Sequence, residues 1–264
     1  MSDVLTIVEV AANGVATLTM NRPDVHNAFD DVLIAELTER LRHLDNDARV
    51  RVVVLAANGK SFSAGADLNW MKRMARYSEA ENLRDAMHLA GLMHTLDRMR
   101  KPTIARVQGA AFGGGVGLVA CCDMAVAARG AQFCLSEVRL GLIPAVISPY
   151  VVQAIGARAA RRYFLTAERF DAAEAHHLGL ASQVVDADRL DEAVSALTDH
   201  LLKGGPHAIA AAKDLIAAVN DRPIEMPVVE DTARRIAQQR ASAEGREGVA
   251  AFLEKRAAAW VGRP

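Results

Sequence analysis

The chain has 264 residues, of which 51% are hydrophobic and 24% are charged, and its formal net charge is -1. This length can bury a large core in one domain, or in one domain with an appendage. The near-neutral charge provides no bulk basic field that would attract nucleic acid or acidic lipid, so we expect neither as a partner.

The sequence contains no sign of a membrane, export or metal role. No apolar run approaches the roughly 20 residues that cross a bilayer. The N-terminus lacks the basic and apolar regions of a signal peptide, so we expect a cytoplasmic location. Three cysteines without CxxC spacing predict buried thiols, and the histidines show no metal-ligand spacing. We therefore expect no metal site.

The start of the chain predicts an α/β unit. Residues 4–10 and 15–20 are β-rich runs separated by Asn13-Gly14, which is a strong hairpin signal. Asp30 or Asp31 is expected to cap a helix with leucines at helical spacing. Residues 52–55 are wholly apolar, which is typical of a strand buried on both faces.

The middle of the chain alternates strands with two loops of small residues. A long helix is expected over residues 79–100, where Lys101-Pro102 would end it. Strands are expected at 103–107, 124–127 and 132–135, a short apolar helix at 116–122, and loops at 58–66 and 112–115.

After Pro144 the pattern becomes helical. Helices are expected at about 145–165, 171–177, 189–203, 206–219, 228–241 and 246–259, with residues 182–185 as the only late strand. We therefore divide the chain into a β-containing core over residues 1–200 and a helical region over residues 201–264. Helical tails of this kind often pack on a neighbouring subunit.

The two small-residue loops are the first candidates for chemistry. Residues 63–67 (Ser-Ala-Gly-Ala-Asp) and 111–115 (Ala-Phe-Gly-Gly-Gly) each follow a strand and precede a helix. Such loops could point two backbone N–H groups at one oxygen and so form an oxyanion hole. From the glycines alone, ordinary tight turns explain them equally simply. The spacings of nucleotide-binding glycine loops are absent.

Glu137 is the second candidate, because it follows a buried strand in apolar surroundings. Burial raises the pKa of a carboxylate and suits it to acid–base catalysis. Considered alone, Glu137 could equally be a salt-bridge partner of Arg139 or Arg129.

A series of motifs then follows in one order along the chain. These are residues 21–29 (Asn-Arg-Pro to Asn-Ala-Phe), 61–68 (Ser-Phe-Ser-Ala-Gly-Ala-Asp-Leu), 101–115 (ending Phe-Gly-Gly-Gly), 122–127, 133–137, 141–144 and 172–180. Together they resemble the enoyl-CoA hydratase/isomerase (crotonase) superfamily over about residues 4–260. The resemblance implies an α/β fold that is a crotonase-type spiral of ββα repeats with a C-terminal helical region, assembled as homotrimers or homohexamers.

The resemblance also implies site residues. It assigns the oxyanion donors to the backbone N–H groups of Ala64 and Gly114, and the acid–base role to Glu137. It implies an acyl-CoA thioester as substrate and no cofactor. Contacts with CoA are implied for Ala64, Gly65, Ala66, Asp67, Leu68, Gly114, His26, Phe252 and Lys255, the last two often across a subunit boundary.

The chain departs from the fullest family pattern at Gly117, where many hydratases carry a second glutamate. Residues 134–139, 145–149 and 161–169 are most similar to bacterial 3-methylglutaconyl-CoA and isohexenylglutaconyl-CoA hydratases of leucine and terpene degradation. That similarity implies an enoyl-CoA hydratase, a hydro-lyase acting on a 3-substituted glutaconyl-CoA.

Two other functions stay open at this point. A Δ3,Δ2-enoyl-CoA isomerase needs only one proton-transferring carboxylate, which fits a single glutamate. A relative that binds CoA or RNA without catalysis is the other, although the net charge argues against RNA. Residues expected at the acyl pocket are Trp70, Met71, Met74 and Tyr150, with Arg139 or Lys72 as candidates to meet a substrate carboxylate.

Overall fold

The computed structural model describes residues 4–262, and the hairpin expected at the start of the chain is confirmed. β1 (Thr6–Val10) and β2 (Val15–Met20) pair antiparallel. Gly14 between them has a φ of 88°, which glycine adopts without strain.

The larger sheet has six strands in the order β1-β2-β3-β5-β7-β10. From β2 onward all neighbours are parallel. The added strands are β3 (Val52–Ala57), β5 (Thr103–Val107), β7 (Met124–Ala128) and β10 (Gln183–Val185). Every residue of β3 is buried, as its apolar sequence predicts for a strand covered on both faces.

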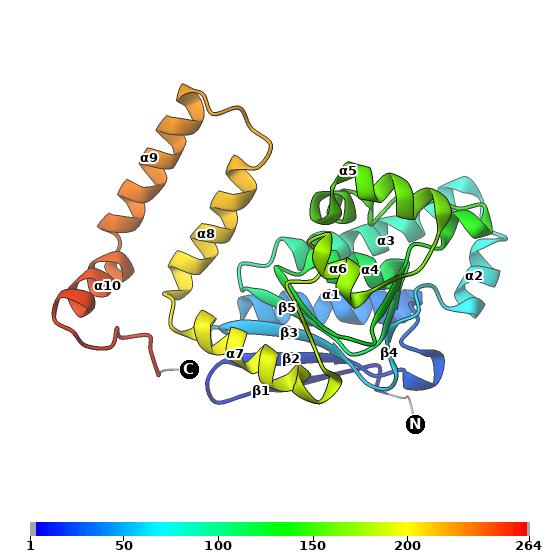
Figure 1. Ribbon diagram of the computed structural model, residues 1–264, viewed down its shortest axis with the longest axis horizontal. Coiled ribbons are helices and arrows are strands. Elements are labelled where there is room, and N and C mark those ends of the chain that lie inside the picture. Colours follow the sequence, from blue (N-terminus) through cyan, green and yellow to red (C-terminus); the bar gives the residue numbers. More distant parts are fainter. Residues whose placement is uncertain (1–3, 263–264) are drawn as a thin grey trace.

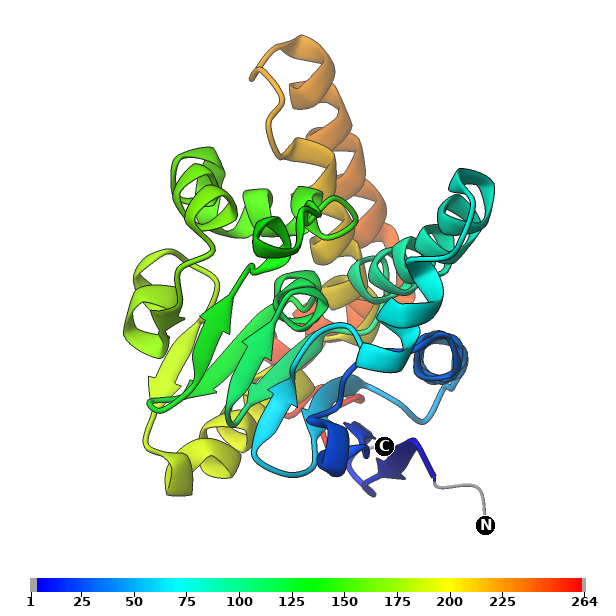
Figure 2. The same cartoon turned by 90° about the vertical axis from the view of Figure 1, so that its right-hand side faces the viewer.

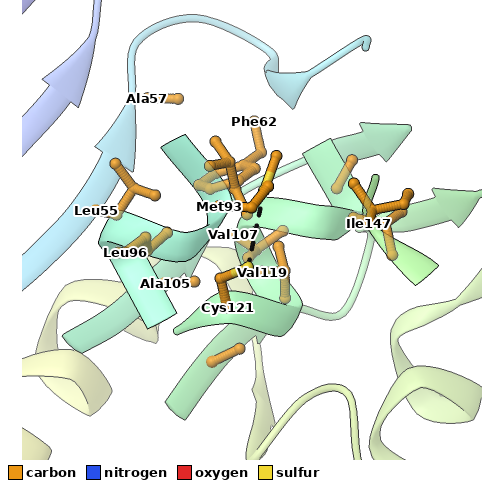
Figure 3. Packing of buried hydrophobic residues seen from close by; sticks show 14 of the residues in the cluster. Leu55, Ala57, Phe62, Met93, Leu96, Ala105, Val107, Val119, Cys121 and Ile147 are labelled. Carbon is orange, nitrogen blue, oxygen red and sulfur yellow. Dashed lines mark hydrogen bonds between the residues drawn. The ribbon is translucent and has the colours of Figure 1, made fainter. Parts of the chain in front are cut away.

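Helices cover both faces of this sheet (Figure 1). One face carries α1 (Asp31–Asn46), α3 (Glu79–Asp97) and α4 (Gly114–Cys121) over the main core, part of which is drawn in Figure 3. α7 (Leu190–Leu202) covers the other face over a smaller core. Asp30 caps α1, as expected, by accepting the Leu33 N–H at 2.8 Å.

A second sheet of four short strands follows the order β4-β6-β8-β9. These are β4 (Ser61–Ser63), β6 (Ala110–Phe112), β8 (Gln132–Cys134) and β9 (Phe170–Asp171). The expectation of a loop throughout residues 58–66 was therefore wrong at β4, and the expectation of a single late strand was wrong because of β9; β6 was not expected. Runs of two or three residues carry no readable periodicity, and their pairing partners lie far away in the sequence. Because β4 and β6 are parallel neighbours, the loops that follow them begin at the same edge.

Further short elements connect these layers. α2 (Leu68–Met74) is the helix expected after the first small-residue loop, and Asp67 caps it by accepting two backbone N–H groups. η1 (Pro23–Val25), η2 (Glu137–Leu140) and η3 (Ala187–Arg189) are single 3-10 turns. α5 (Ser148–Thr166) and α6 (Ala172–His177) fall where helices were expected.

The last helices form an arm that stands away from the sheets (Figures 1 and 2). They are α8 (Pro206–Val219), α9 (Met226–Ala241) and α10 (Ala243–Leu253). Neither α8 nor α9 has a fully buried residue, so the arm contributes little to the core of this chain. The domain boundary expected at residue 200 stays a prediction.

Candidate active site

The loop after β4 is held by backbone hydrogen bonds to residues 26–29. The Ala64 N–H donates to the His26 carbonyl at 2.9 Å, and the Asp67 N–H donates to the Phe29 carbonyl at 2.8 Å. Phe29 and Ala66 form a parallel β-bridge. The Ala66 N–H, between these two bonded positions, has no acceptor among the described residues.

This pattern corrects the expected oxyanion donor. An N–H that already donates at 2.9 Å cannot also hold a substrate oxygen, so Ala64 is excluded from that role. The unpaired N–H of the loop belongs to Ala66. The sequence could not show this, because the donor's partner comes from the separate segment at His26.

Side chains of the same segment reinforce the loop. The Asn27 amide donates to the carbonyls of Asn58 and Ser61 at 2.8 and 2.9 Å, and the Ser63 hydroxyl donates to the Asn27 carbonyl at 2.9 Å. Asn27 is fully buried. The loop is thereby positioned before any ligand binds.

Arg22 connects residues 28–30 to the loop after β4. Its guanidinium lies 3.1 Å from the Asp30 carboxylate and 3.3 Å from the Asp67 carboxylate, and it donates to the Ala28 carbonyl at 2.6 Å. Burial acts to raise the pKa of Asp67, but two backbone N–H groups and Arg22 outweigh it and lower that pKa. Arg22 was not among the residues expected at the site, although it lies in the first motif.

The second loop begins α4. The Gly113 N–H donates to the Cys134 carbonyl at 2.8 Å, and Gly113 has a φ of 51° and a ψ of -120°, which favours glycine. Gly114 is the first residue of the helix. Within residues 4–262 its N–H has no acceptor, so the positive end of the helix presents a free donor.

The two loops and Glu137 meet at one point. A Cβ on Gly113 would lie 3.9 Å from the Gly65 Cα and 3.1 Å from the Glu137 Oε1. A Cβ on Gly65 would lie 3.0 Å from the Phe112 carbonyl oxygen. The small residues are thus required by the close approach of the loops, and the interpretation as independent tight turns is insufficient.

Glu137, at the start of η2, is the acidic group of this site. Burial raises its pKa above the ordinary value, although a hydrogen bond with its own backbone N–H acts in the opposite direction. Its Oε2 is buried and has no hydrogen-bond partner. The expected rise in pKa is confirmed. Arg129 pairs with Asp186 at 2.8 Å, and no cation of the described chain pairs with Glu137, so the salt-bridge interpretation was wrong.

Gly117 lies one turn into α4 and carries no carboxylate. A Cβ there would lie 2.3 Å from the Ile147 Cγ2 and 3.3 Å from the Met93 Cε. Both side chains are buried and appear together in Figure 3. The volume that a second acid–base side chain would need is therefore filled by hydrocarbon.

The residues expected to contact CoA fall into two groups. Gly65 to Leu68 lie at the site, and Leu68 is 74% exposed. His26 is exposed near them, with its Nδ1 3.1 Å from the Ser61 hydroxyl. Phe252 and Lys255 lie at the end of the arm, far from α2 and β4 in Figure 1, and Phe252 is 81% exposed. Within one chain, the structure does not bring them to the site.

The residues expected at the acyl pocket have different surroundings. Trp70 is buried, and its indole N–H donates to Asp85 at 3.1 Å. Tyr150 lines a cavity with Cys122 and Gly179, and its expected place at the acyl pocket stays a prediction. Met71 and Met74 are half-buried.

Three further observations concern metal ligands, membrane-spanning helices and cysteines. Over residues 4–262 no group of three His, Cys, Asp or Glu side chains is arranged to hold a metal ion. In the same range no helix is both long and apolar enough to cross a membrane. Cys121 and Cys134 are buried free thiols, as expected, and Cys122 is partly exposed.

Comparisons with known proteins are consistent with one another. The sequence pattern of the enoyl-CoA hydratase/isomerase family matches residues 10–263. The crystal structure of an enoyl-CoA hydratase from Shewanella pealeana is 48% identical, with a TM-score of 0.95 over 98% of this chain and 97% of that chain.

Two relatives from Escherichia coli (strain K12) differ in the reaction that their names state. The 2,3-dehydroadipyl-CoA hydratase is 33% identical over 94% of this chain and 96% of its own length. The 1,2-epoxyphenylacetyl-CoA isomerase is 32% identical over 95% and 96%. Relatives at this distance therefore include both a hydratase and an isomerase.

Proposed function

The chain belongs to the enoyl-CoA hydratase/isomerase family, whose enzymes act on acyl-CoA thioesters, and we propose that it adds water across the 2,3 double bond of an enoyl-CoA. In this proposal the Ala66 and Gly114 N–H groups bind the thioester oxygen and Glu137 transfers the protons. The observation that carries it is that the two loops, each with an unpaired N–H, approach each other closely beside the buried carboxylate of Glu137.

The N–H pair supplies the electrostatic part of catalysis. As water adds to Cβ, the electron pair of the double bond moves through Cα to the thioester oxygen, which becomes an enolate. Preorganised donors stabilise that charge, and each contributes on the order of 3 kcal/mol. Since the Ala66 loop is held by Asn27 and Arg22, little reorganisation is needed when the charge develops.

Glu137 has to perform both proton transfers. Its carboxylate removes a proton from the attacking water, and the resulting carboxylic acid delivers a proton to Cα. A raised pKa suits this double role, because the group must be an effective base and then an effective acid. No second carboxylate on α4 can share the work.

An isomerase is the second candidate, and the same observation favours it. Moving a double bond from the 3,4 to the 2,3 position requires one group that removes a proton from Cα and returns it to Cγ. A single carboxylate beside an oxyanion hole is sufficient for that step. The apolar filling around Gly117 is as compatible with it as with hydration.

For the acyl group we propose a 3-substituted glutaconyl chain, on the similarity of residues 134–139 and 145–149 to hydratases of such esters. Burial is the main cause of the raised pKa of Glu137, and a substrate carboxylate beside it would add repulsion between like charges. We therefore expect the distal carboxylate toward the surface, where Arg139 and Lys72 are exposed and have no acidic partner among residues 4–262.

We also propose that the protein is a homo-oligomer, a trimer or hexamer, in the cytoplasm, and the surface of the arm is the feature that supports an assembly. It exposes large apolar side chains, including Ile216, Ile236 and Phe252. Exposed apolar surface of this kind is typical of a subunit interface. In such an assembly Phe252 and Lys255 of one subunit would contact the CoA bound to its neighbour.

The test is to incubate the purified protein with crotonyl-CoA, 3-methylglutaconyl-CoA and a 3-enoyl-CoA in water enriched in ¹⁸O. Hydration incorporates the label into a 3-hydroxyacyl product, whereas isomerisation moves the double bond without label. A preference for 3-methylglutaconyl-CoA over crotonyl-CoA would support the proposed acyl group. Migration of the double bond without uptake of oxygen would replace the hydratase by the isomerase.

A further inference from the structure

A long side chain at position 117 would extend toward the site. The Gly117 N–H donates to the Gly113 carbonyl at 3.3 Å, so the two residues are one helical turn, about 6 Å, apart along α4. The Cα–Cβ bonds of a helix tilt toward its N-terminus, so a side chain on residue 117 points back toward Gly113. A Cβ on Gly113 would lie 3.1 Å from the Glu137 Oε1, and a carboxyl group on a long side chain at position 117 would therefore be within reach of Glu137.

Ile147 is held firmly in the position that such a side chain would take. Its Cγ2 and Cβ lie 2.3 and 2.9 Å from the place of a Cβ on Gly117. Ile147 is 3% exposed, and its carbonyl accepts the Val151 N–H at 3.0 Å as α5 begins. The backbone is thus anchored and the side chain is β-branched, so rotation about χ1 provides little relief.

We propose that Ile147 determines which proton transfers the site can perform, because its side chain occupies the space beside Glu137 that a second acid–base group on α4 would require. This inference rests on the proposed function, in which Glu137 acts on an enoyl thioester. Ile147 is a specificity-determining residue in this scheme, since it exchanges no proton itself.

The physical consequence is a one-carboxylate site. The Ile147 and Met93 side chains offer a water molecule no strong hydrogen-bond partner, so in this scheme Glu137 holds the attacking water. The proton taken from that water can then reach Cα only by way of Glu137. With a carboxylic acid at position 117, Glu137 would take the water proton while the second group delivered another proton to Cα.

The experiment compares Gly117→Glu, Ile147→Gly and the double variant. Gly117→Glu alone should lose thermal stability, because its Cβ overlaps Ile147. Ile147→Gly removes both close atoms, so the double variant should be more stable than Gly117→Glu alone. It should also hydrate crotonyl-CoA at least 10-fold faster, in kcat/KM, than Ile147→Gly, since a positioned acid contributes about 10²–10⁴-fold.

The matched control is Gly117→Gln with Ile147→Gly, which has the same shape without the acid. It should show the stability effect and no gain in hydration. Equal gains from Gln and Glu, or no gain from Glu, would overturn the inference, as would a Gly117→Glu variant as stable as the wild type. A wild-type chain inert toward every thioester would instead refute the proposed function. In that case hydration of crotonyl-CoA by the double variant would support the Ile147 inference, and its absence would overturn it.

Discussion

Replacing Glu137 by Gln removes the charge and keeps the shape of the side chain. We expect kcat/KM with the preferred enoyl-CoA to fall by about 10²–10⁴-fold, the usual contribution of a positioned general base. The substrate KM should change little, because the N–H groups of Ala66 and Gly114 and the loop bonds are unaffected.

The same substitution should stabilise the fold at neutral pH. Burial raises the pKa of Glu137 above its ordinary value of 4.5, so the native state binds this proton more tightly than the unfolded state does. The resulting cost to the wild type is absent well below pH 4.5, grows as the pH rises, and is complete above the raised value. Gln cannot ionise, so its advantage must follow the same pH dependence.

The magnitude follows from the raised pKa, because each unit by which burial raises it costs the ionised native state about 1.4 kcal/mol. For a chain of this size 1 kcal/mol moves the midpoint of thermal unfolding by about 2 °C. We therefore expect Glu137→Gln to raise the midpoint at pH 8 by roughly 3 °C for each unit by which burial raises the pKa, and by almost nothing near pH 4.

The assay is thermal unfolding at fixed protein concentration at both pH values, together with steady-state kinetics. Glu39→Gln is the control, since Glu39 is exposed on α1 without an ion-pair partner in the described chain and should change neither property. Undiminished activity of Glu137→Gln toward every acyl-CoA would place the base elsewhere. A stability gain of equal size at pH 4 would show that charge burial is not its cause.

Two further predictions concern the oxyanion loops. Gly114→Ala places a Cβ 2.8 Å from the Cε2 of the buried Phe29 ring, so the backbone N–H at this position must shift. We expect kcat in steady-state assays to fall about 10²–10³-fold. An unchanged kcat would exclude the Gly114 N–H as an oxyanion donor. Arg22→Met leaves the Asp30 and Asp67 carboxylates without their shared cation and should lower the free energy of unfolding in urea by about 1–3 kcal/mol at pH 7. The loss should shrink toward pH 3, because the pKa of Asp67 is lowered in the native state and its stabilising contribution disappears on protonation. An equal loss at both pH values would contradict the ionic explanation.

Long elements and local signals were predictable. The hairpin at Asn13-Gly14, the Asp30 cap and the wholly apolar β3 depend on nearest neighbours in the chain, and all three are found. β4, β6 and β9 were missed because strands of two or three residues are stabilised by pairing rather than by their own sequence.

The two N–H donors of the site, at Gly114 and Ala66, also differ in whether local or distant residues determine them. The family resemblance assigned Gly114, and the structure begins α4 at this residue, two positions earlier than expected, where an N–H is unpaired by the local geometry. Ala64 and Ala66 are neighbours of a glycine in one loop, and no local rule distinguishes them. The segment from His26 to Phe29 decides between them, because the His26 carbonyl accepts the Ala64 N–H and the Phe29 carbonyl accepts the Asp67 N–H, which leaves the Ala66 N–H unpaired.

By itself the sequence determined the family pattern, the presence of Glu137 and the absence of a carboxylate at Gly117, because each depends only on the identity of residues along the chain. Only the tertiary structure decided that Ala66 holds the free N–H and that Ile147 fills the place of the absent acid. Both depend on which distant segment packs against a residue, and hydrogen bonds and steric exclusion act through space at a few ångströms, whatever the separation along the chain.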